Sequence, residues 1–555
     1  MSRSAVAPLG GPPVRQPRTS SRLLGSLALV VVTGLAAMGA TRAPATAQGA
    51  RTGQDTVSLD QVIPAPVSAV AGGSPFTLTA RTVIRVDGGA RGREARGVGH
   101  YLAGILRPST GYLLPVSSLP GKDGIRLRLS AADKGLGEEG YRLESGRRAV
   151  TVTARTPAGL FHGVQTLRQL LPPAVEKNSR QPGPWRIAGG VIEDVPRFAY
   201  RGAMLDVSRH FFTVDQVKRY IDQLALYKIN TLHLHLSDDQ GWRIAVDSWP
   251  RLAAYGGSTQ VGGGPGGHYS KAQYKEIVRY AGSRHMELVP EIDMPGHTNA
   301  ALASYAELNC DGVAPPLYTG TGVGFSSLCV PKEVTYDFVD DVIRELAVLT
   351  PGRYLHIGGD EAHSTSHEDY VAFMDRAQAV VQKYGKTVVG WHQLTGARPA
   401  EGAVAQYWGY DATGAAERAQ VVRAAQNGTR VVLSPADRVY LDMKYDRDTP
   451  LGLDWAGLVE VRRSYDWDPG SYLAGLPADA LLGIEAPLWT ETVSTSAHID
   501  YMAFPRVPGI AELGWSPASA HDWEDYRLRL AAHGPRMTAL GIGFYRSPQV
   551  PWPAR

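Results

Sequence analysis

The chain has 555 residues, a formal net charge of +4 and 20% charged residues. This length exceeds one ordinary domain, so we expect two or three compact units. A charge this small over such a length, with no clustered basic face, argues against nucleic-acid binding. The 43% of hydrophobic residues is typical of a globular protein.

The first 47 residues have the pattern of a secretory signal peptide. Three arginines precede an apolar stretch from 23 to 37, and Ala45-Thr46-Ala47 supplies a small-residue cleavage site. The apolar stretch is short and contains two glycines and a serine, which disfavours a membrane anchor. We therefore expect cleavage near Ala47 and secretion, with no membrane association of the mature protein.

The only two cysteines, Cys310 and Cys329, lie in a segment rich in glycine, proline and serine. In an exported protein this arrangement favours a disulfide that closes a loop. Two free buried thiols are the alternative, and two cysteines cannot by themselves complete a structural zinc site.

The segment from 48 to 197 indicates a smaller, non-catalytic α+β domain. Ser145-Gly146 is the predicted turn of a hairpin, and Pro172-Pro173 ends a helix with leucines at helical spacing. His162 lies in that helix, and we interpret it as part of the helix surface. The predicted elements are strands at 77–79, 83–86, 125–129, 141–143 and 150–152 and a helix at 159–171.

The segment from 198 to 555 alternates strands with helices, which is typical of βα units. Eight such units fit a closed (β/α)8 TIM barrel better than an open sheet, so we predict an α/β fold in which this barrel is the catalytic domain. The predicted strands are 203–207, 229–236, 286–292, 354–357, 388–391, 404–408, 431–433 and 481–489, and the predicted helices are 214–227, 271–284, 334–349, 370–383 and 415–426.

The fourth predicted strand leads into two glycines and two adjacent carboxylates, Asp360 and Glu361. Glycines remove side-chain bulk, so a ligand could approach the backbone there. Two neighbouring carboxylates could divide two catalytic tasks between them. The alternative is a helix N-terminus, with Asp360 as N-cap and Glu361 in the first turn.

In a TIM barrel the carboxyl ends of all strands meet at one rim, where active sites lie. Each predicted strand ends in an acid, an arginine or a tryptophan. Carboxylates and arginine bind vicinal hydroxyls and indole rings stack on apolar sugar faces, so this set predicts a pocket for a neutral glycoside. The residues are Arg209, Asp238, Asp293, His297, Asp360, Glu361, Trp391, Trp408, Asp442, Trp489 and Glu491.

Five motifs, in this order, resemble the β-N-acetylhexosaminidases of glycoside hydrolase family 20. They are D-V-S-R-H-F at 206–211, H-L-H-L-S-D-D-Q-G-W-R at 233–243, P-E-I-D-M-P-G-H at 290–297, H-I-G-G-D-E at 356–361 and L-W-T-E at 488–491. The resemblance covers about 60 to 555, because the smaller domain also resembles that family's non-catalytic N-terminal domain. No motif position is substituted.

The resemblance implies a retaining enzyme, and we expect neither a cofactor nor a metal. We also expect exo action, because charged groups would close the pocket behind the non-reducing sugar. The substrate would be an oligosaccharide or glycoconjugate with a terminal β-linked N-acetylhexosamine, whose own acetamido oxygen attacks the anomeric carbon. Glu361 would be the general acid and then the base, Asp360 would orient the acetamido group, and Tyr440 would hydrogen-bond its oxygen. Trp391, Trp408 and Trp489 would wall in the sugar, Arg209, Glu491, Asp442 and His297 would hold it, and Trp455 would support the next sugar.

The residues support this mechanism in a second way. Asp360 and Glu361 are sequence neighbours and are poorly placed for opposite faces of one anomeric carbon, so a nucleophile from the substrate removes a difficulty. We also expect the charge of Asp360 to raise the pKa of a partly buried Glu361.

Two other functions remain open from the sequence. His233 and His235, followed by Asp238, could ligate a metal ion in a metal-dependent barrel hydrolase. A sugar-binding protein without catalysis would keep the pocket but lose the acid, and Glu361 is present.

Overall fold

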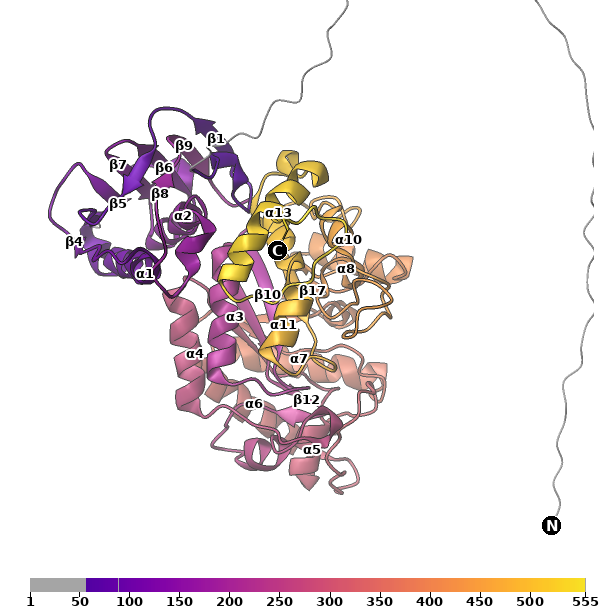
Figure 1. The fold of residues 1–555 in the computed structure, drawn as a ribbon. Coiled ribbons are helices and arrows are strands. Elements are labelled where there is room, and N and C mark those ends of the chain that lie inside the picture. Colours follow the sequence, from indigo (N-terminus) through magenta and orange to yellow (C-terminus); the bar gives the residue numbers. More distant parts are fainter. Residues whose placement is uncertain (1–55, 88, 555) are drawn as a thin grey trace, which may run out of the picture. The chain divides into compact units, whose positions relative to one another are not determined.

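The computed structural model describes residues 56–87 and 89–554, so the predicted signal peptide lies outside the described residues. These residues form a smaller domain, followed by a barrel (Figure 1). The predicted boundary at 197 falls in the connection between the last strand of the smaller domain and the first barrel strand. Within the described ranges, no helix is long and apolar enough to cross a membrane.

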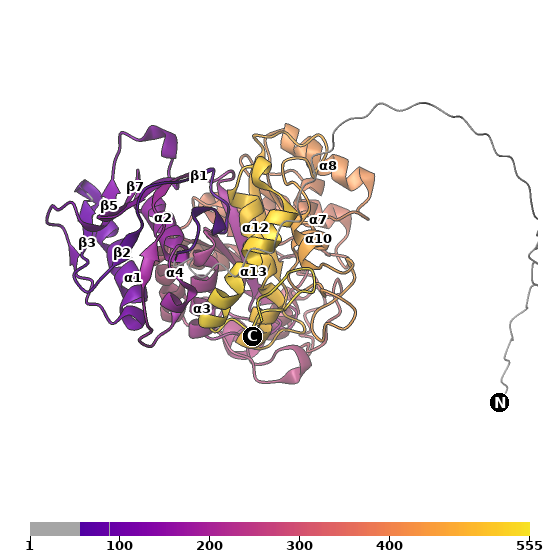
Figure 2. The same cartoon turned by 45° about the horizontal axis from the view of Figure 1, so that its top comes forward.

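The smaller domain is a mixed seven-stranded sheet, in the order β1-β9-β6-β7-β5-β3-β4, with two helices that contact the sheet and each other. Figure 2 shows both helices beside the strands. Apolar residues of β6 alternate with exposed charged ones, as expected when one face of a sheet is covered. The elements are β1 Ser68–Ala71, β3 Ile84–Asp87, β4 Val116–Ser117, β5 Gly124–Leu129, β6 Tyr141–Gly146, β7 Ala149–Ala154, β9 Gly190–Asp194, α1 Gly92–Thr110 and α2 Pro157–Gln169, with β2 Phe76–Leu78 and β8 Trp185–Ile187 as a separate pair.

Three details of this domain differ from the sequence-based expectation. Ser145 and Gly146 pair within the β6–β7 ladder, so the hairpin turn lies at 147–148. Helix α1 was not predicted, because four glycines lower its helix propensity. His162 is buried, with Nε2 3.1 Å from Glu139, so its assignment to the helix surface is wrong.

The eight predicted barrel strands are confirmed, and β10 pairs with β19 to close the barrel. The strands are β10 Tyr200–Asp206, β11 Thr231–His235, β14 Glu287–Glu291, β15 Tyr354–His356, β16 Thr387–Trp391, β17 Val404–Tyr407, β18 Arg430–Leu433 and β19 Leu481–Leu488, with β12 Ser237–Asp238 and β13 Gly241–Trp242 as a small ribbon. The helices are α3 Val214–Leu226, α4 Lys271–Ser283, α5 Asn299–Ser304, α6 Glu333–Leu349, α7 His367–Lys383, α8 Ala415–Gln426, α9 Ala436–Val439, α10 Val461–Tyr465, α11 Ser496–Ala503, α12 Arg506–Trp515 and α13 Trp523–Ala539.

Local sequence explains where two of the barrel helices begin. Thr213 caps α3 and Ser270 caps α4, and each forms a reciprocal capping box with a glutamine three residues later. Such a box satisfies backbone N–H groups that a helix start leaves unpaired. These helices therefore start at fixed residues, which fixes the lengths of the loops that precede them.

Three carboxylates of the smaller domain are paired with barrel side chains. Asp194 lies 2.8 Å from Lys228, and Glu139 lies 2.7 Å from Arg201. Glu176 pairs at once with Arg168 of its own domain and with Arg536 of α13. Since breaking a buried pair leaves an uncompensated charge, these contacts oppose separation of the domains.

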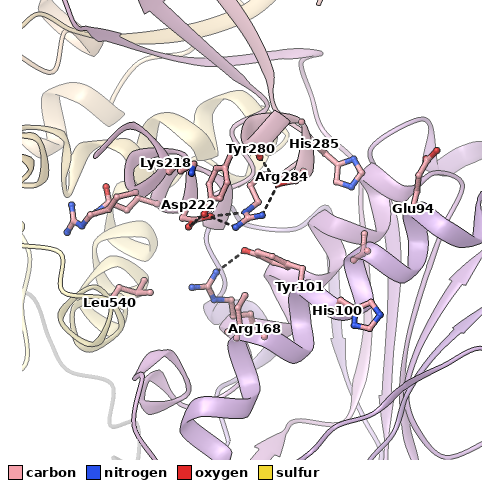
Figure 3. A pocket seen from close by; sticks show the side chains of 18 of the residues that line it. Glu94, His100, Tyr101, Arg168, Lys218, Asp222, Tyr280, Arg284, His285 and Leu540 are labelled. Carbon is pink, nitrogen blue, oxygen red and sulfur yellow. Dashed lines mark hydrogen bonds and ion pairs between the residues drawn. The ribbon is translucent and has the colours of Figure 1, made fainter. Parts of the chain in front are cut away.

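A cleft of about 1,010 Å³ lies where α1 faces α3 and α4 (Figure 3). Arg284 lies over the rings of Tyr101 and Tyr280, with its guanidinium carbon 5.0 and 4.2 Å from their centroids. The same arginine donates to Asp222 at 2.8 Å. These polar groups satisfy one another across the cleft and form no catalytic constellation.

Candidate active site

A second cavity, of about 430 Å³, opens at the carboxyl-terminal rim of the barrel. That is the end at which the loops of a TIM barrel place active sites. Ten residues predicted from the sequence line it: Arg209, His297, Asp360, Glu361, Trp408, Tyr440, Asp442, Trp455, Trp489 and Glu491. Sequence reasoning missed four others, Thr321, Val323, Tyr410 and Leu453.

The two adjacent carboxylates lie in the loop between β15 and α7. Helix α7 begins only at His367 and is capped by Ser366, so the alternative of a helix cap at Asp360 is wrong. Gly358 has φ +65°, and a Cβ there would lie 1.6 Å from Oδ1 of Asp293. Glycine is therefore required for the backbone to pass this close.

His297 faces both carboxylates. Its Nε2 lies 3.8 Å from Asp360 and 3.5 Å from Glu361, while its Nδ1 lies 3.2 Å from Asp238. Both His297, at φ +55°, and Glu361, at φ +44°, adopt the left-handed backbone region that non-glycine residues rarely occupy. Such strain is concentrated at functional sites, where the surrounding structure fixes a side-chain direction.

The pKa values of Asp360 and Glu361 differ from the sequence-based expectation. Burial alone would raise the pKa of Glu361, but the hydrogen bond and charge of His297 outweigh it and lower that pKa. Burial, with the charges of Glu361 and Glu291, instead raises the pKa of Asp360 to about 6 against the opposing charge of His297. The prediction that Asp360 raises the pKa of Glu361 is therefore wrong, because His297 was not considered.

Asp238, Asp293 and Trp391, predicted to contact substrate, lie beneath the cavity and are not part of its lining. Asp238 pairs with Arg209 and His235, both at 2.7 Å. Asp293 accepts from the backbone N–H of Gly359 at 3.0 Å, and burial together with the charge of Asp360 raises its pKa well above the usual range. These side chains position the residues above them.

The closed end of the cavity is built around Arg209. Its guanidinium carbon lies 4.8 Å from the centre of the Trp489 ring, a cation–π contact. Asp206 accepts from the backbone of Arg209 at 3.0 Å and from that of Thr490 at 3.1 Å, which joins the ends of β10 and β19. Sequence reasoning gave Asp206 no role, although it opens one of the five motifs.

Several buried polar atoms of the cavity have no hydrogen-bond partner among the described residues. They include Nε of Arg209, Oδ1 of Asp360 and both carboxylate oxygens of Asp442. Buried polar groups in proteins are nearly always paired, so unpaired ones grouped in one cavity indicate groups that bind a polar ligand.

Aromatic side chains form the remaining wall. Trp408 is fixed by a hydrogen bond from Nε1 to Gln393 at 3.0 Å, and Trp455 packs edge-on against it with centroids 6.0 Å apart. Trp455 is 46% exposed and lies at the mouth. Burial raises the pKa of Tyr440 well above its usual range, so this phenol remains a hydrogen-bond donor.

The predicted disulfide Cys310–Cys329 is confirmed. It closes the segment that contributes Thr321 and Val323 to the cavity. Ser364, three residues after Glu361, donates to the carbonyl of Gly324 at 2.8 Å and ties this segment to the rim. The cysteine pair was the only signal in the sequence that this loop is ordered.

The arrangement of His233 and His235 does not favour a metal site. His233 lies 2.8 Å from Glu485 and 3.0 Å from Glu291 inside the barrel. Among the residues that the structure describes, four groups of buried acids and histidines have ligand atoms close enough to share an ion. Neighbouring carboxylates raise the pKa of His233 to about 9, and those of His235 and His297 well above their usual range, although burial acts in the opposite direction. Each of the four groups contains one of these three histidines, and protonation of an imidazole competes with metal coordination.

Comparisons with known proteins cover both domains. The family model described as "Glycosyl hydrolase family 20, catalytic domain" matches residues 198–518, and the model of domain 2 of that family matches residues 60–195. A β-N-acetylhexosaminidase of Cellulomonas fimi is 43% identical over 495 residues, which are 89% of this chain and 97% of that protein.

Solved structures agree with these matches. The family 20 β-N-acetylhexosaminidase of Streptomyces coelicolor A3(2) superimposes with a TM-score of 0.88 at 71% identity, covering 90% of this chain and 100% of that one. A Streptomyces plicatus β-hexosaminidase variant in complex with its product, GlcNAc, gives a TM-score of 0.88 at 72% identity, covering 91% and 100%. The chain therefore belongs to glycosyl hydrolase family 20 and is a glycoside hydrolase.

Proposed function

We propose that the rim cavity binds a terminal, non-reducing β-linked N-acetylhexosamine and that the substrate's own acetamido oxygen displaces the leaving group. The chain is an exo-acting β-N-acetylhexosaminidase, the activity named for the relatives reported above. Its substrates are oligosaccharides and glycoconjugates that end in such a sugar.

One observation carries this mechanism. Asp360 and Glu361 both face the same imidazole nitrogen of His297, at 3.8 and 3.5 Å, and so lie on one side of the cavity. The usual retaining mechanism requires two carboxylates across the anomeric carbon from each other, one as nucleophile. A pair on one side suits an acid and an orienting group, and leaves the nucleophile to the substrate.

In this mechanism Glu361 protonates the leaving oxygen and later takes a proton from water. His297 lies 3.5 Å from this carboxylate, and Asp238 raises the pKa of His297, so the protonation of Glu361 depends on the charge of its neighbour. Asp360 is the anion that orients the acetamido N–H and balances the positive charge of the oxazolinium-like intermediate. Tyr440 donates to the acetamido oxygen.

The remaining lining residues hold the sugar. Arg209, Asp442 and Glu491 bind ring hydroxyls at the closed end, which requires the non-reducing terminus to enter first. Trp408 and Trp489 enclose the sugar, with Trp391 packed behind Trp489 at 5.6 Å between ring centroids. The half-exposed Trp455 stacks on the next sugar at the mouth.

The deciding assay compares an aryl β-N-acetylglucosaminide with the matching aryl β-glucoside. Cleavage of the first alone is expected, because only that substrate carries the nucleophile. Equal cleavage of both would contradict substrate assistance. Binding of the sugar without cleavage of either would favour a non-catalytic sugar-binding protein.

We further propose that residues 1–47 are a secretory signal peptide and that the mature enzyme is secreted. The basic start, the apolar stretch and the Ala45-Thr46-Ala47 site support this. The test is N-terminal sequencing of the protein from culture medium. A start near residue 48 is expected, and an intact N-terminus on a cell-retained protein would contradict the proposal.

A further inference from the structure

The interior of this barrel contains a layer of ionisable side chains. TIM-barrel interiors are dominated by bulky branched apolar residues, and burying a carboxylate is costly. Here Glu291 of β14 is fully buried, and its carboxylate has four side chains against it, those of His233, His235, His356 and Trp391. None of these contacts is part of the reaction described above.

One oxygen of Glu291 leads to the catalytic acid. Oε2 pairs with Nδ1 of His235, whose Nε2 lies 2.7 Å from Oδ2 of Asp238. Asp238 in turn lies 3.2 Å from His297, which faces Glu361. A series of hydrogen-bonded, buried groups therefore connects β14 to His297, whose Nε2 lies 3.5 Å from the residue that transfers the proton.

The other oxygen leads to the sugar-binding wall. Oε1 accepts from Nε1 of Trp391 at 2.9 Å. The Trp391 ring packs against Trp489, which lines the cavity. A single carboxylate thus contacts both the series that leads to Glu361 and the tryptophan that packs behind the cavity wall.

We propose that Glu291 is a positioning residue of the reaction, which holds the Asp238–His297–Glu361 series with one oxygen and the Trp391–Trp489 wall with the other. This inference rests on the proposed function. It assigns to the polar core of the barrel an effect on catalysis that is separate from its effect on stability.

Charges around Glu291 are consistent with this role. Against the effect of burial, Glu291 and its neighbouring carboxylates raise the pKa values of His233 and His235, while the three histidines lower that of Glu291. The carboxylate is therefore an anion between two imidazoliums. Its charge also contributes to the raised pKa of Asp360.

Glu485 of β19 provides a matched control. It is as deeply buried and pairs with the same His233, at 2.8 Å. Its other partners are the side chains of Tyr200 and Gln406. Gln406 is the ladder partner of Trp391, but its side chain bonds Ser434 and Glu485, not the indole. Replacing Glu485 therefore disturbs the polar core but leaves the contacts of Glu291 with His235 and Trp391 in place.

The experiment compares Glu291→Gln with Glu485→Gln, assayed well below the Tm of either. For Glu291→Gln we expect at least a tenfold loss in kcat/KM on the aryl β-N-acetylglucosaminide. Affinity for a thiazoline analogue of the intermediate should fall by a similar factor, and the acidic limb of the pH profile should move to lower pH. Glu485→Gln should stay within twofold of native on each measure, despite a lower Tm.

Equal kinetic losses in the two variants, or none in either, would overturn the inference and leave the layer a purely structural role. If Glu291→Gln does not fold, the contacts of Glu291 with His235 and with Trp391 are tested one at a time. His235→Gln should shift the pH profile, and Trp391→Phe, which lacks the donor, should weaken thiazoline binding; native behaviour of both would also overturn it. A native enzyme inactive on the aryl substrate would instead refute the proposed function.

Discussion

At the level of single residues, the active site depends on which carboxylate carries a proton. His297 faces Asp360 and Glu361, and the negative charge of Asp238 stabilises its protonated form. Its influence lowers the pKa of Glu361, whereas burial and two neighbouring acids raise that of Asp360. Each carboxylate therefore titrates according to its contacts and not to its residue type.

The first prediction concerns Glu361→Gln. This variant should lose about a thousandfold in kcat on an oligosaccharide, since general acid catalysis contributes about 10²–10⁴-fold. The loss should be smaller for an aryl glycoside with an acidic phenol, whose departure needs little protonation. Kinetics on both substrates measure this. Glu368→Gln, an exposed change on α7, is the control, and equal losses on the two substrates would contradict the role of Glu361.

The second prediction concerns pH. In the proposed mechanism Asp360 acts as an anion, and its pKa is raised to about 6, so kcat/KM should fall as the pH drops below that value. Asp360→Asn should lower activity and abolish this acidic limb, because the amide does not titrate. A pH profile of both proteins checks this, and an acidic limb unchanged in the variant would show that another group titrates there.

At the level of elements, the cavity is assembled from loops that follow different strands. The longest connection in this rim, between β14 and α6, contains the disulfide and contributes Thr321 and Val323 to the mouth. Its ends are held by backbone hydrogen bonds, such as Leu328 N–H to the Pro295 carbonyl at 3.0 Å. The loop is therefore held both by its disulfide and by its hydrogen bonds to the rim.

The third prediction follows from that loop. Replacing Cys310 and Cys329 with serine should lower the free energy of unfolding by about 3 kcal/mol, because closing a loop of this size restricts the unfolded chain. KM for an oligosaccharide should rise more than KM for an aryl monosaccharide, since Thr321 and Val323 lie at the mouth. Chemical denaturation and kinetics measure both, and a proportional change in the two KM values would place the loop outside the substrate path.

At the level of the whole molecule, the smaller domain is held to the barrel by buried ion pairs. Glu176 lies between Arg168 and Arg536, both almost fully buried. Burial would raise the pKa of Glu176, but the two arginines lower it overall. The rim cavity is lined by barrel residues alone. We therefore expect a change at this interface to lower the stability of the protein without lowering its catalytic rate.

The fourth prediction tests whether this interface contributes to stability and not to catalysis. Glu176→Gln should cost about 3–5 kcal/mol, because it leaves two buried guanidinium groups without their anion. A lowered folded-state pKa contributes stability above the unfolded value of 4.5 and loses it as the pH falls below that value. The variant should therefore show a flatter decline of Tm below pH 4.5, with native kcat at 25 °C. Glu138→Gln, on an exposed side chain, is the control, and a reduced kcat without a lower Tm would contradict this expectation.

The sequence by itself determined the order of elements and the identity of the chemistry. Apolar runs and helical spacings are local properties, so all eight barrel strands could be predicted from them. The rim residues followed, because barrel topology places every strand end on one side. The five motifs then indicated the family and its reaction.

The tertiary structure decided what depends on distances between remote segments. It placed Asp238, Asp293 and Trp391 beneath the cavity and buried His162 against Trp515 of α12. It set the pKa of Glu361 through His297, 64 residues away in the chain. Burial, desolvation and charge pairing arise only when such segments meet, so no pattern along the chain contains them.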